Sequence, residues 1–148
     1  MYHILLAEDT PDKRAFLSEA IDDANTGAPI ICKDHASEAL AHIQVHAREI
    51  VAAFIDYTFQ WEELVGTDLI KALRELNREC LILLVTSHPR ASEEFTRRKE
   101  LALANGANDA LSTNMLPYNA GDWIYMMLME KRAEWKAAYG LEPVTREE

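Results

Sequence analysis

The most constraining feature of this chain is an apolar run, residues 51–55, that ends abruptly in the carboxylate of Asp56. Five apolar residues without polar alternation indicate a strand covered on both faces, which is typical of a parallel sheet between layers of helices. Asp56 is then the first polar group at the carboxyl end of that strand, where open parallel sheets bind ligands. A lone Asp in this position also serves to cap a turn or a helix. Only further acidic groups at the same edge would indicate a site.

Four other segments are predicted to be strands of the same sheet. Residues 2–7 end in Glu8 and Asp9, residues 80–85 end in Thr86, and residues 29–32 and 109–113 are shorter. Apolar residues at helical spacing separate these strands, and the predicted helices begin at Thr10-Pro11, near Ala36, at Thr67, near Ser92 and near Asn119 or Gly121. This alternation predicts an α/β fold with a doubly wound, five-stranded parallel sheet.

The length and charge of the chain limit its domain organisation and its partners. With 148 residues and 49% apolar content, it suits one domain with a single substantial core. We expect that domain in residues 1–139 and a mobile acidic tail in residues 140–148. The formal charge of -10 leaves no broad basic surface for a phosphate backbone, so we expect no direct binding of nucleic acid.

The cysteines and the apolar runs indicate the compartment. Cys32 and Cys80 lie in apolar runs without a CxxC pair, and no secretory pattern follows Met1. Both therefore read as buried thiols of a cytoplasmic protein. The apolar runs are strand-sized, far below the ~20 residues that span a bilayer, so we expect no membrane anchor.

The ends of three strands are expected to meet at one edge of the sheet. Right-handed crossovers would bring the carboxyl ends of the first, third and fourth strands together. The side chains that would share this pocket are Glu8, Asp9, Asp56 and Thr86. Because three carboxylates in a small space repel one another, they are either partly protonated or neutralised by a hard cation, and oxygen ligands favour Mg²⁺. A divalent ion beside an Asp suits phosphoryl transfer.

With these residues in this order, the sequence resembles the receiver domain of two-component response regulators over roughly residues 2–131. The segments that carry the resemblance are Glu8-Asp9, Asp56, Thr86, residues 35–40 and residues 106–111. The resemblance implies a flavodoxin-like sheet with strand order 2-1-3-4-5.

The resemblance also implies a role for each residue of the pocket. Asp56 would accept a phosphoryl group from a phosphohistidine on a sensor histidine kinase or phosphotransfer protein, or from a small phosphodonor. Asp9 would bind Mg²⁺ directly and Glu8 would bind it through water. The backbone carbonyl of Thr58 would complete the protein's ligands. Thr86 would move its hydroxyl onto the phosphoryl group and act as the switch.

Two positions depart from the family's pattern. Where the family's fifth strand ends in Lys-Pro, this chain has Thr113 and Asn114, and a threonine has neither the reach nor the charge to contact phosphoryl oxygens. The aromatic switch residue expected three positions earlier is Ala110. Lys13 and Arg90 are the candidates for a substitute cation, and the sequence does not place either side chain.

These departures leave two interpretations open. The first is an atypical single-domain receiver of a phosphorelay, which is phosphorylated and signals through a protein-binding surface. The second is a pseudo-receiver, an interaction module that is not efficiently phosphorylated. A metal-dependent phosphatase fits less well, because Thr58, two residues after Asp56, is no acid or base. We therefore expect no enzymatic activity beyond Mg²⁺-dependent self-phosphorylation and self-dephosphorylation.

Two segments are more apolar than their positions require. The loop of residues 57–66 carries Phe59, Trp61 and Leu64, which would cover the site or bind a partner. The last helix crowds apolar residues into positions 123–128, although packing on the chain's own core explains them equally well. Since receivers commonly use the face of their fourth and fifth helices, we expect a downstream protein partner or a homodimer there.

Overall fold

The computed structural model describes residues 1–114 and 117–145, in which five strands alternate with five α-helices. The strands are β1 (His3–Ala7), β2 (Ile30–Lys33), β3 (Ile50–Asp56), β4 (Leu81–Thr86) and β5 (Asp109–Ser112). The helices are α1 (Pro11–Asp23), α2 (Ala36–His46), α3 (Gly66–Leu76), α4 (Glu93–Ala104) and α5 (Pro117–Tyr139), and a 3₁₀ turn, η1 (Ala47–Glu49), precedes β3.

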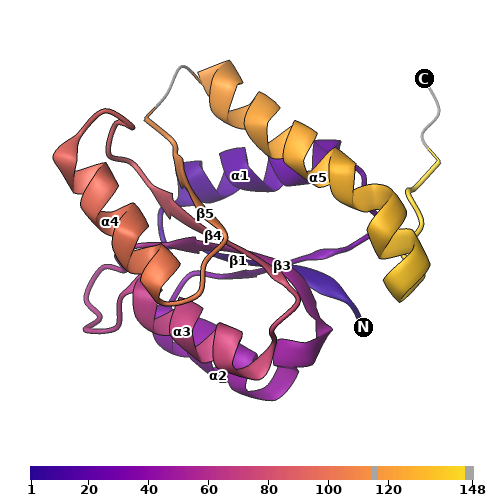
Figure 1. Cartoon of the computed structure of the whole chain (residues 1–148), viewed down its shortest axis with the longest axis horizontal. Coiled ribbons are helices and arrows are strands. Elements are labelled where there is room, and N and C mark those ends of the chain that lie inside the picture. Colours follow the sequence, from indigo (N-terminus) through magenta and orange to yellow (C-terminus); the bar gives the residue numbers. More distant parts are fainter. Residues whose placement is uncertain (115–116, 146–148) are drawn as a thin grey trace.

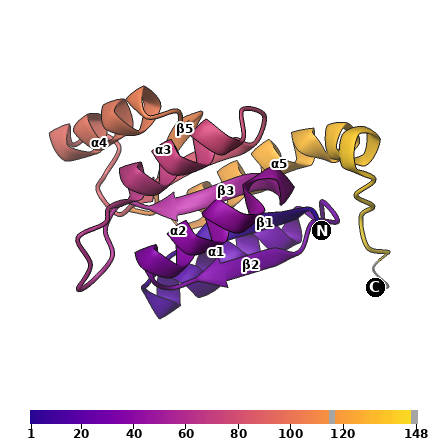
Figure 2. The same ribbon diagram turned by 90° about the horizontal axis from the view of Figure 1, so that it is seen from below.

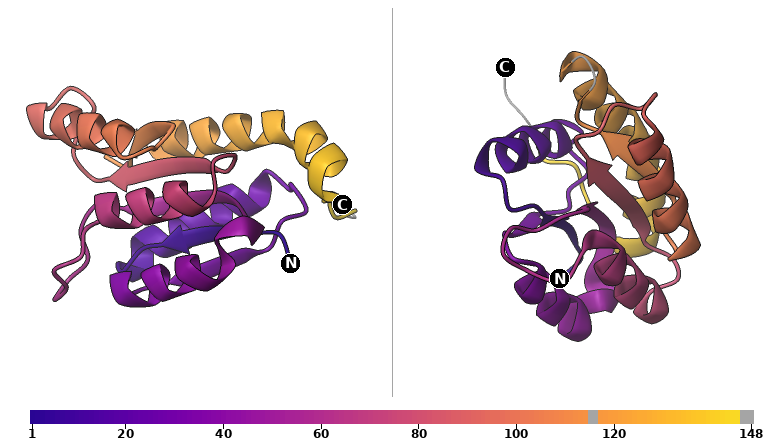
Figure 3. Two further views of the ribbon diagram at one scale, coloured as in Figure 1. Left: turned by 60° about the horizontal axis from the view of Figure 1, so that its bottom comes forward. Right: turned by 90° about the vertical axis from the view of Figure 1, so that its left-hand side faces the viewer.

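All paired strands run parallel, in the order β2-β1-β3-β4-β5. Helices α1 and α5 cover one face of the sheet, and α2, α3 and α4 cover the other (Figures 1 and 2). Figure 3 shows the same two layers from further directions. The structure thus confirms the predicted doubly wound sheet and its strand order. The order reverses between β1 and β3, so the carboxyl ends of these strands form the switch point at which such sheets bind ligands.

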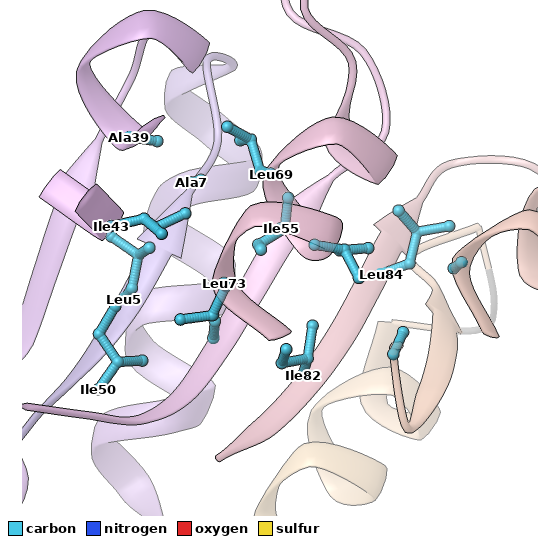
Figure 4. Close-up of a cluster of buried hydrophobic side chains, with 14 of the residues drawn as sticks. Leu5, Ala7, Ala39, Ile43, Ile50, Ile55, Leu69, Leu73, Ile82 and Leu84 are labelled. Carbon is cyan, nitrogen blue, oxygen red and sulfur yellow. The ribbon is translucent and has the colours of Figure 1, made fainter. Parts of the chain in front are cut away.

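Each face of the sheet has its own core, and β3 contributes to both. Because successive side chains of a strand point to opposite faces, Ala53 and Ile55 join the cluster under α2, α3 and α4. Ala52 and Phe54 join the cluster under α1 and α5. Figure 4 shows the first cluster, in which Leu73 of α3 lies over the sheet. All seven residues of β3 are buried, as expected for a strand covered on both faces.

The ends of the elements differ slightly from the prediction. Helix α5 begins at Pro117, ahead of the predicted start near Asn119 or Gly121, and proline suits a first helical turn because its missing N–H needs no partner. Ser92 caps α4 by accepting a hydrogen bond from the Phe95 amide at 3.1 Å. In the described part of the chain, no helix is long and apolar enough to cross a membrane.

The prediction that both cysteines are buried is correct for Cys80 and wrong for Cys32. Cys80 is buried just ahead of β4. Cys32 is exposed because it lies in β2, an edge strand whose residues are at most partly covered. Its sulfur lies 3.8 Å from the Ser18 hydroxyl of α1.

The segment after α5 returns to the connection between α1 and β2. The Asn25 side chain donates a hydrogen bond to the Val144 carbonyl at 2.9 Å and accepts one from the Val144 amide at 2.8 Å. Leu141 packs against the core under α1 and α5. The mobility of residues 140–148 stays a prediction, and residues 146–148 lie outside the described residues.

Two leucines of α3 test how far the core stabilises the fold. Leu73 is fully buried, whereas Leu76 is about half exposed. Leu73→Ala is expected to lower the free energy of unfolding by about 2–5 kcal/mol, because it leaves a cavity under α3. Leu76→Ala should change it by no more than about 0.5 kcal/mol. Urea unfolding of the two variants measures both values, and equal losses would contradict this packing.

Candidate functional site

The carboxylates predicted to converge lie together at the carboxyl edge of the sheet. Glu8 and Asp9 directly follow β1, and Asp56 is the last residue of β3. One carboxylate oxygen from each of the three residues lies within 4.8 Å of those of the other two. Glu8 is fully buried and Asp56 is 5% exposed, while Asp9 is partly exposed. The pocket therefore opens to solvent on the side of Asp9.

Lys13 supplies the positive charge of this pocket. Its ammonium nitrogen lies 3.1 Å from Glu8 Oε1 and 3.2 Å from Asp56 Oδ1. Helix α1 begins at Pro11, so the helix places Lys13 in its first turn, directly over the strand ends. Arg90, the other candidate cation, is exposed and lines a small pocket with Phe95 and Trp123. The structure thus places Lys13, and not Arg90, beside Asp56.

The three charges shift one another's proton affinity. Burial, and then the repulsion of Asp56, raises the pKa of Glu8 to about 8. Burial also raises the pKa of Asp56, although the Lys13 ammonium acts in the opposite direction. Burial alone would lower the pKa of Lys13, but the two carboxylates outweigh it and raise that pKa. Lys13 therefore stays charged, while the carboxylates still favour a proton or a further cation.

The hydrogen bonds of the pocket leave room for such a cation. Glu8 Oε2 accepts a hydrogen bond from the Thr10 amide at 3.2 Å, and Asp56 Oδ1 accepts one from the Tyr57 amide at 2.9 Å. The buried Glu8 Oε1 has the ionic contact with Lys13 but accepts no hydrogen bond from the described residues. A buried oxygen with unused acceptor capacity, among other carboxylates, fits a hard ion such as Mg²⁺.

Thr86 is held by a contact that the sequence did not predict. Its buried hydroxyl accepts a hydrogen bond from Arg98 Nη1 of α4 at 3.1 Å. The same guanidinium donates to Glu94 Oε1 at 2.8 Å and lies 4.1 Å from the centre of the Tyr57 ring. Arg98 thereby joins the ends of β3 and β4 to α4. A helix pattern cannot show this contact, because it depends on how α4 lies over the sheet edge.

The loop between β3 and α3 is held at two points, one in the site and one at the start of α2. The Gln60 amide donates to Asp9 Oδ2 at 2.7 Å. The Glu62 carboxylate accepts hydrogen bonds from two amides at the start of α2, those of Ala36 at 2.6 Å and Ser37 at 3.0 Å. Between these points Trp61 is 97% exposed, with a φ of 66° that is uncommon for a residue with a side chain. The loop therefore presents Trp61 beside the pocket.

The other predicted site residues lie around the pocket. Thr58 is exposed in the loop after β3, and metal binding by its carbonyl stays a prediction. Thr113 follows β5, and its amide donates to the Thr86 carbonyl at 2.9 Å. Ala110 is buried in the core cluster under α4, where the family's aromatic is absent. Phe59, which was expected to cover the site or bind a partner, packs into the same core cluster.

Fold and site together define a class, a flavodoxin-like α/β domain with an acidic pocket at its switch point. No family model matches the sequence, and no curated protein matches it. Solved structures do match. A response regulator receiver domain from Rhodospirillum rubrum has 16% identity, covers 88% of this chain and 94% of its own, and has a TM-score of 0.71. A receiver domain from Clostridium thermocellum has 13% identity, covers 90% of this chain and 98% of its own, and has a TM-score of 0.67. One from Methanospirillum hungatei has 23% identity, the same two coverages and a TM-score of 0.61. The chain has the fold of a response-regulator receiver domain.

The raised pKa of Glu8 predicts how stability depends on pH. An unfolded Glu titrates near 4.5, whereas the folded pKa is about 8, so the folded protein retains a proton that the unfolded chain releases. The stabilisation of the folded protein by this retained proton is fully present below pH 4.5 and is lost as the pH rises towards 8. Glu8→Gln should therefore gain stability relative to the parent across this range. Urea unfolding of both proteins at several pH values, in the presence of a metal chelator, measures this difference in the free energy of unfolding.

The comparison with the parent is essential, because His42 acts in the opposite direction. Burial lowers the pKa of His42 to about 4, so its contribution is lost as the pH falls. That contribution is the same in both proteins and cancels in the difference. Parallel stability curves for parent and Glu8→Gln would show that Glu8 keeps an ordinary pKa.

Proposed function

We propose that this protein is a receiver that accepts a phosphoryl group on Asp56 and signals through a protein partner. The observation that carries the proposal is the Lys13 ammonium, 3.2 Å from Asp56 Oδ1 inside an acidic pocket at the switch point. The donor would be a phosphohistidine of a sensor kinase or phosphotransfer protein, or a small phosphodonor. The fold of receiver domains supports this assignment as an analogy.

In the proposed transfer, a carboxylate oxygen of Asp56 attacks the phosphorus of a phosphohistidine. A bond forms between this oxygen and phosphorus, and the phosphorus–nitrogen bond breaks with its electron pair on the donor's imidazole. Glu8, Asp9 and Asp56, with the carbonyl of Thr58, would hold Mg²⁺, which when bound neutralises the phosphoryl oxygens. The reaction is a single stoichiometric transfer and needs no separate acid or base at Thr58.

Lys13 would perform the task of the lysine that is absent after β5. Thr113 is uncharged, while the Lys13 ammonium already contacts the acceptor carboxylate. Lys13 comes from α1 and not from β5, so the charge would reach the phosphoryl group from the other side of the pocket. A fixed cation at this point stabilises the charge of the transferring group.

Arg98 would couple the pocket to α4 in place of the missing aromatic. Thr86 now accepts a hydrogen bond from Arg98 and one from the His88 amide at 3.4 Å, which leaves the hydroxyl proton free to donate. If Thr86 turns to donate to a phosphoryl oxygen, Arg98 loses an acceptor. Arg98 also stacks on Tyr57, so α4 and the loop after β3 would respond together.

The alternative is a pseudo-receiver that acts as an interaction module without phosphorylation. The observation in its favour is that the Lys13 ammonium already offsets part of the repulsion between Glu8 and Asp56, which stabilises the pocket when no phosphate or metal is bound. Either function requires a partner surface. Ile124 and Leu128 are buried in the core, which agrees with core packing, whereas Tyr125 and Met126 are exposed on α5. These exposed side chains support a partner or homodimer surface that includes α5.

Phosphorylation by acetyl phosphate with Mg²⁺ tests the proposal. The parent should gain one phosphoryl group by intact mass, and Asp56→Asn should gain none. Lys13→Met should slow labelling by on the order of 10² to 10³, the usual cost of removing a fixed charge from a transferring group. Thr113→Lys in the Lys13→Met background should recover part of this rate.

Arg90→Ala is the matched control, because it also removes a cation from the chain but not from the pocket. Its labelling rate should equal that of the parent. An unlabelled parent protein, with Mg²⁺ present and circular dichroism confirming the fold, would leave the pseudo-receiver as the function. Equal slowing by Arg90→Ala and Lys13→Met would contradict the role given to Lys13.

A further inference from the structure

A groove of about 670 Å³ runs between α1 and α5, which pack side by side on one face of the sheet (Figure 1). This volume lies within the range of about 300–1,000 Å³ that is typical of ligand pockets. The lining comes from the second half of α1 and the beginning of α5, and includes Phe16, Glu19, Asp23, Gly121, Asp122 and Tyr125. None of these residues belongs to the acidic pocket at the strand ends, so the groove is a separate feature.

Two aromatic rings and a glycine shape the groove. Phe16 is partly buried against the core under α1 and α5, whereas Tyr125 is 41% exposed. At Gly121 a β-carbon would have only the Phe16 ring near it, at 4.0 Å, so the neighbours leave room for a side chain. Because glycine inside a helix is less favourable than alanine, packing gives no reason for it here. The missing side chain keeps the groove open between the two rings.

The rim of the groove carries three carboxylates. Glu19 and Asp23 are four residues apart on α1, so they lie on one side of the helix and repel each other. Both lie near the C-terminal end of α1, where the helix dipole favours cations, yet its last turn has no basic residue. Asp122 adds a third negative charge from α5. The described residues supply no ion pair to any of the three.

These properties select the chemistry of the ligand. Acidic groups beside aromatic faces suit an organic cation, since a cation is attracted both to carboxylates and to the face of a ring. A guanidinium group fits best, because it is flat enough to stack and donates hydrogen bonds to two carboxylates at once. With a formal charge of -10 on the chain, a second copy would be repelled from this acidic rim.

We propose that the groove between α1 and α5 binds a basic segment of a partner protein, with an arginine side chain between Phe16 and Tyr125. The guanidinium would lie among the carboxylates of Glu19, Asp23 and Asp122. This proposal names the chemistry of the partner surface that the proposed function places on α5, so it rests on that function. The binding itself needs no phosphoryl group.

Nuclear magnetic resonance of the ¹⁵N-labelled full chain tests the proposal with a blocked hexapeptide, acetyl-(Ala-Arg)₃-amide. Excess Mg²⁺ is present to occupy the acidic pocket at the strand ends. The peptide should cause saturable shifts of backbone amides in residues 16–23 and 121–125. The same peptide with lysine in place of arginine should bind more weakly, because an ammonium group has no flat face to stack on the rings.

Three variants separate the groove from a general attraction to an acidic chain. Glu19→Gln together with Asp23→Asn should weaken binding by roughly tenfold, because two of the three charges are lost. Gly121→Met should weaken it about as much without any change of charge, because the new side chain fills the groove. Asp34→Asn together with Glu38→Gln is the matched control, since it removes two exposed acids at α2, and it should bind like the parent.

The melting temperature without peptide gives a second readout. Glu19→Gln together with Asp23→Asn should melt at a higher temperature than the parent, because the change relieves the repulsion on α1 and the conflict with its dipole. A lower melting temperature would show that these carboxylates already stabilise the fold, which contradicts an unfilled site.

Circular dichroism confirms that each variant is folded. Unchanged peptide binding in a folded Gly121→Met variant would place the peptide outside the groove and overturn the proposal. Equal weakening in the control variant would do the same. Sedimentation that shows a dimer of the parent, which Gly121→Met dissociates, would assign the groove to a second copy instead.

Labelling of Asp56 by acetyl phosphate keeps this proposal distinct from the proposed function. The variant without the Glu19 and Asp23 charges should be labelled like the parent, since neither residue lines the acidic pocket. A parent that binds the arginine peptide in the groove but is not labelled would contradict the phosphoryl acceptor alone. A labelled parent that binds no arginine peptide would contradict the groove alone.

Discussion

The contact between Lys13 and the buried carboxylates of Glu8 and Asp56 is the interaction on which the site depends. Two buried carboxylates a few ångströms apart cannot both remain ionised unless a positive charge offsets their repulsion, and otherwise one of them retains a proton. The parallel sheet brings the two acids together, and α1 places the ammonium between them. Removal of this one charge would leave an unpaired charge in the core, so the same lysine serves both the fold and the chemistry.

The pocket is also connected to the elements around it. Asp9 accepts a hydrogen bond from the loop that presents Trp61, and Thr86 accepts one from Arg98 of α4. A ligand that uses Asp9 or Thr86 must compete with these bonds. Occupation of the pocket would therefore change the hydrogen bonds that hold the loop after β3 and α4. These two segments form the surface around Asp56 that a protein donor or partner would meet first.

The sequence predicted those features that follow from local pattern. Apolar runs such as residues 51–55 identified the strands, and the acids at their ends identified the edge. The choice between Lys13 and Arg90 could not be made, because it depends on the angle at which α1 crosses the strand ends. Arg98 gave no signal, since a charged residue of a charged helix looks solvent-exposed until the helix is placed. Cys32 was misassigned because an apolar run does not distinguish an edge strand from a central one.

In the proposed function, Lys13 and the carboxylates form a phosphoryl-binding pocket at Asp56. A crystal structure with Mg²⁺ and beryllofluoride, a stable mimic of a phosphoryl group, tests it most directly. We expect the beryllofluoride group on an Asp56 oxygen, with the Lys13 ammonium and the Thr86 hydroxyl within hydrogen-bonding distance of its fluorines. A structure in which Asp56 stays unmodified, or in which Lys13 points away from a bound fluoride group, would contradict it.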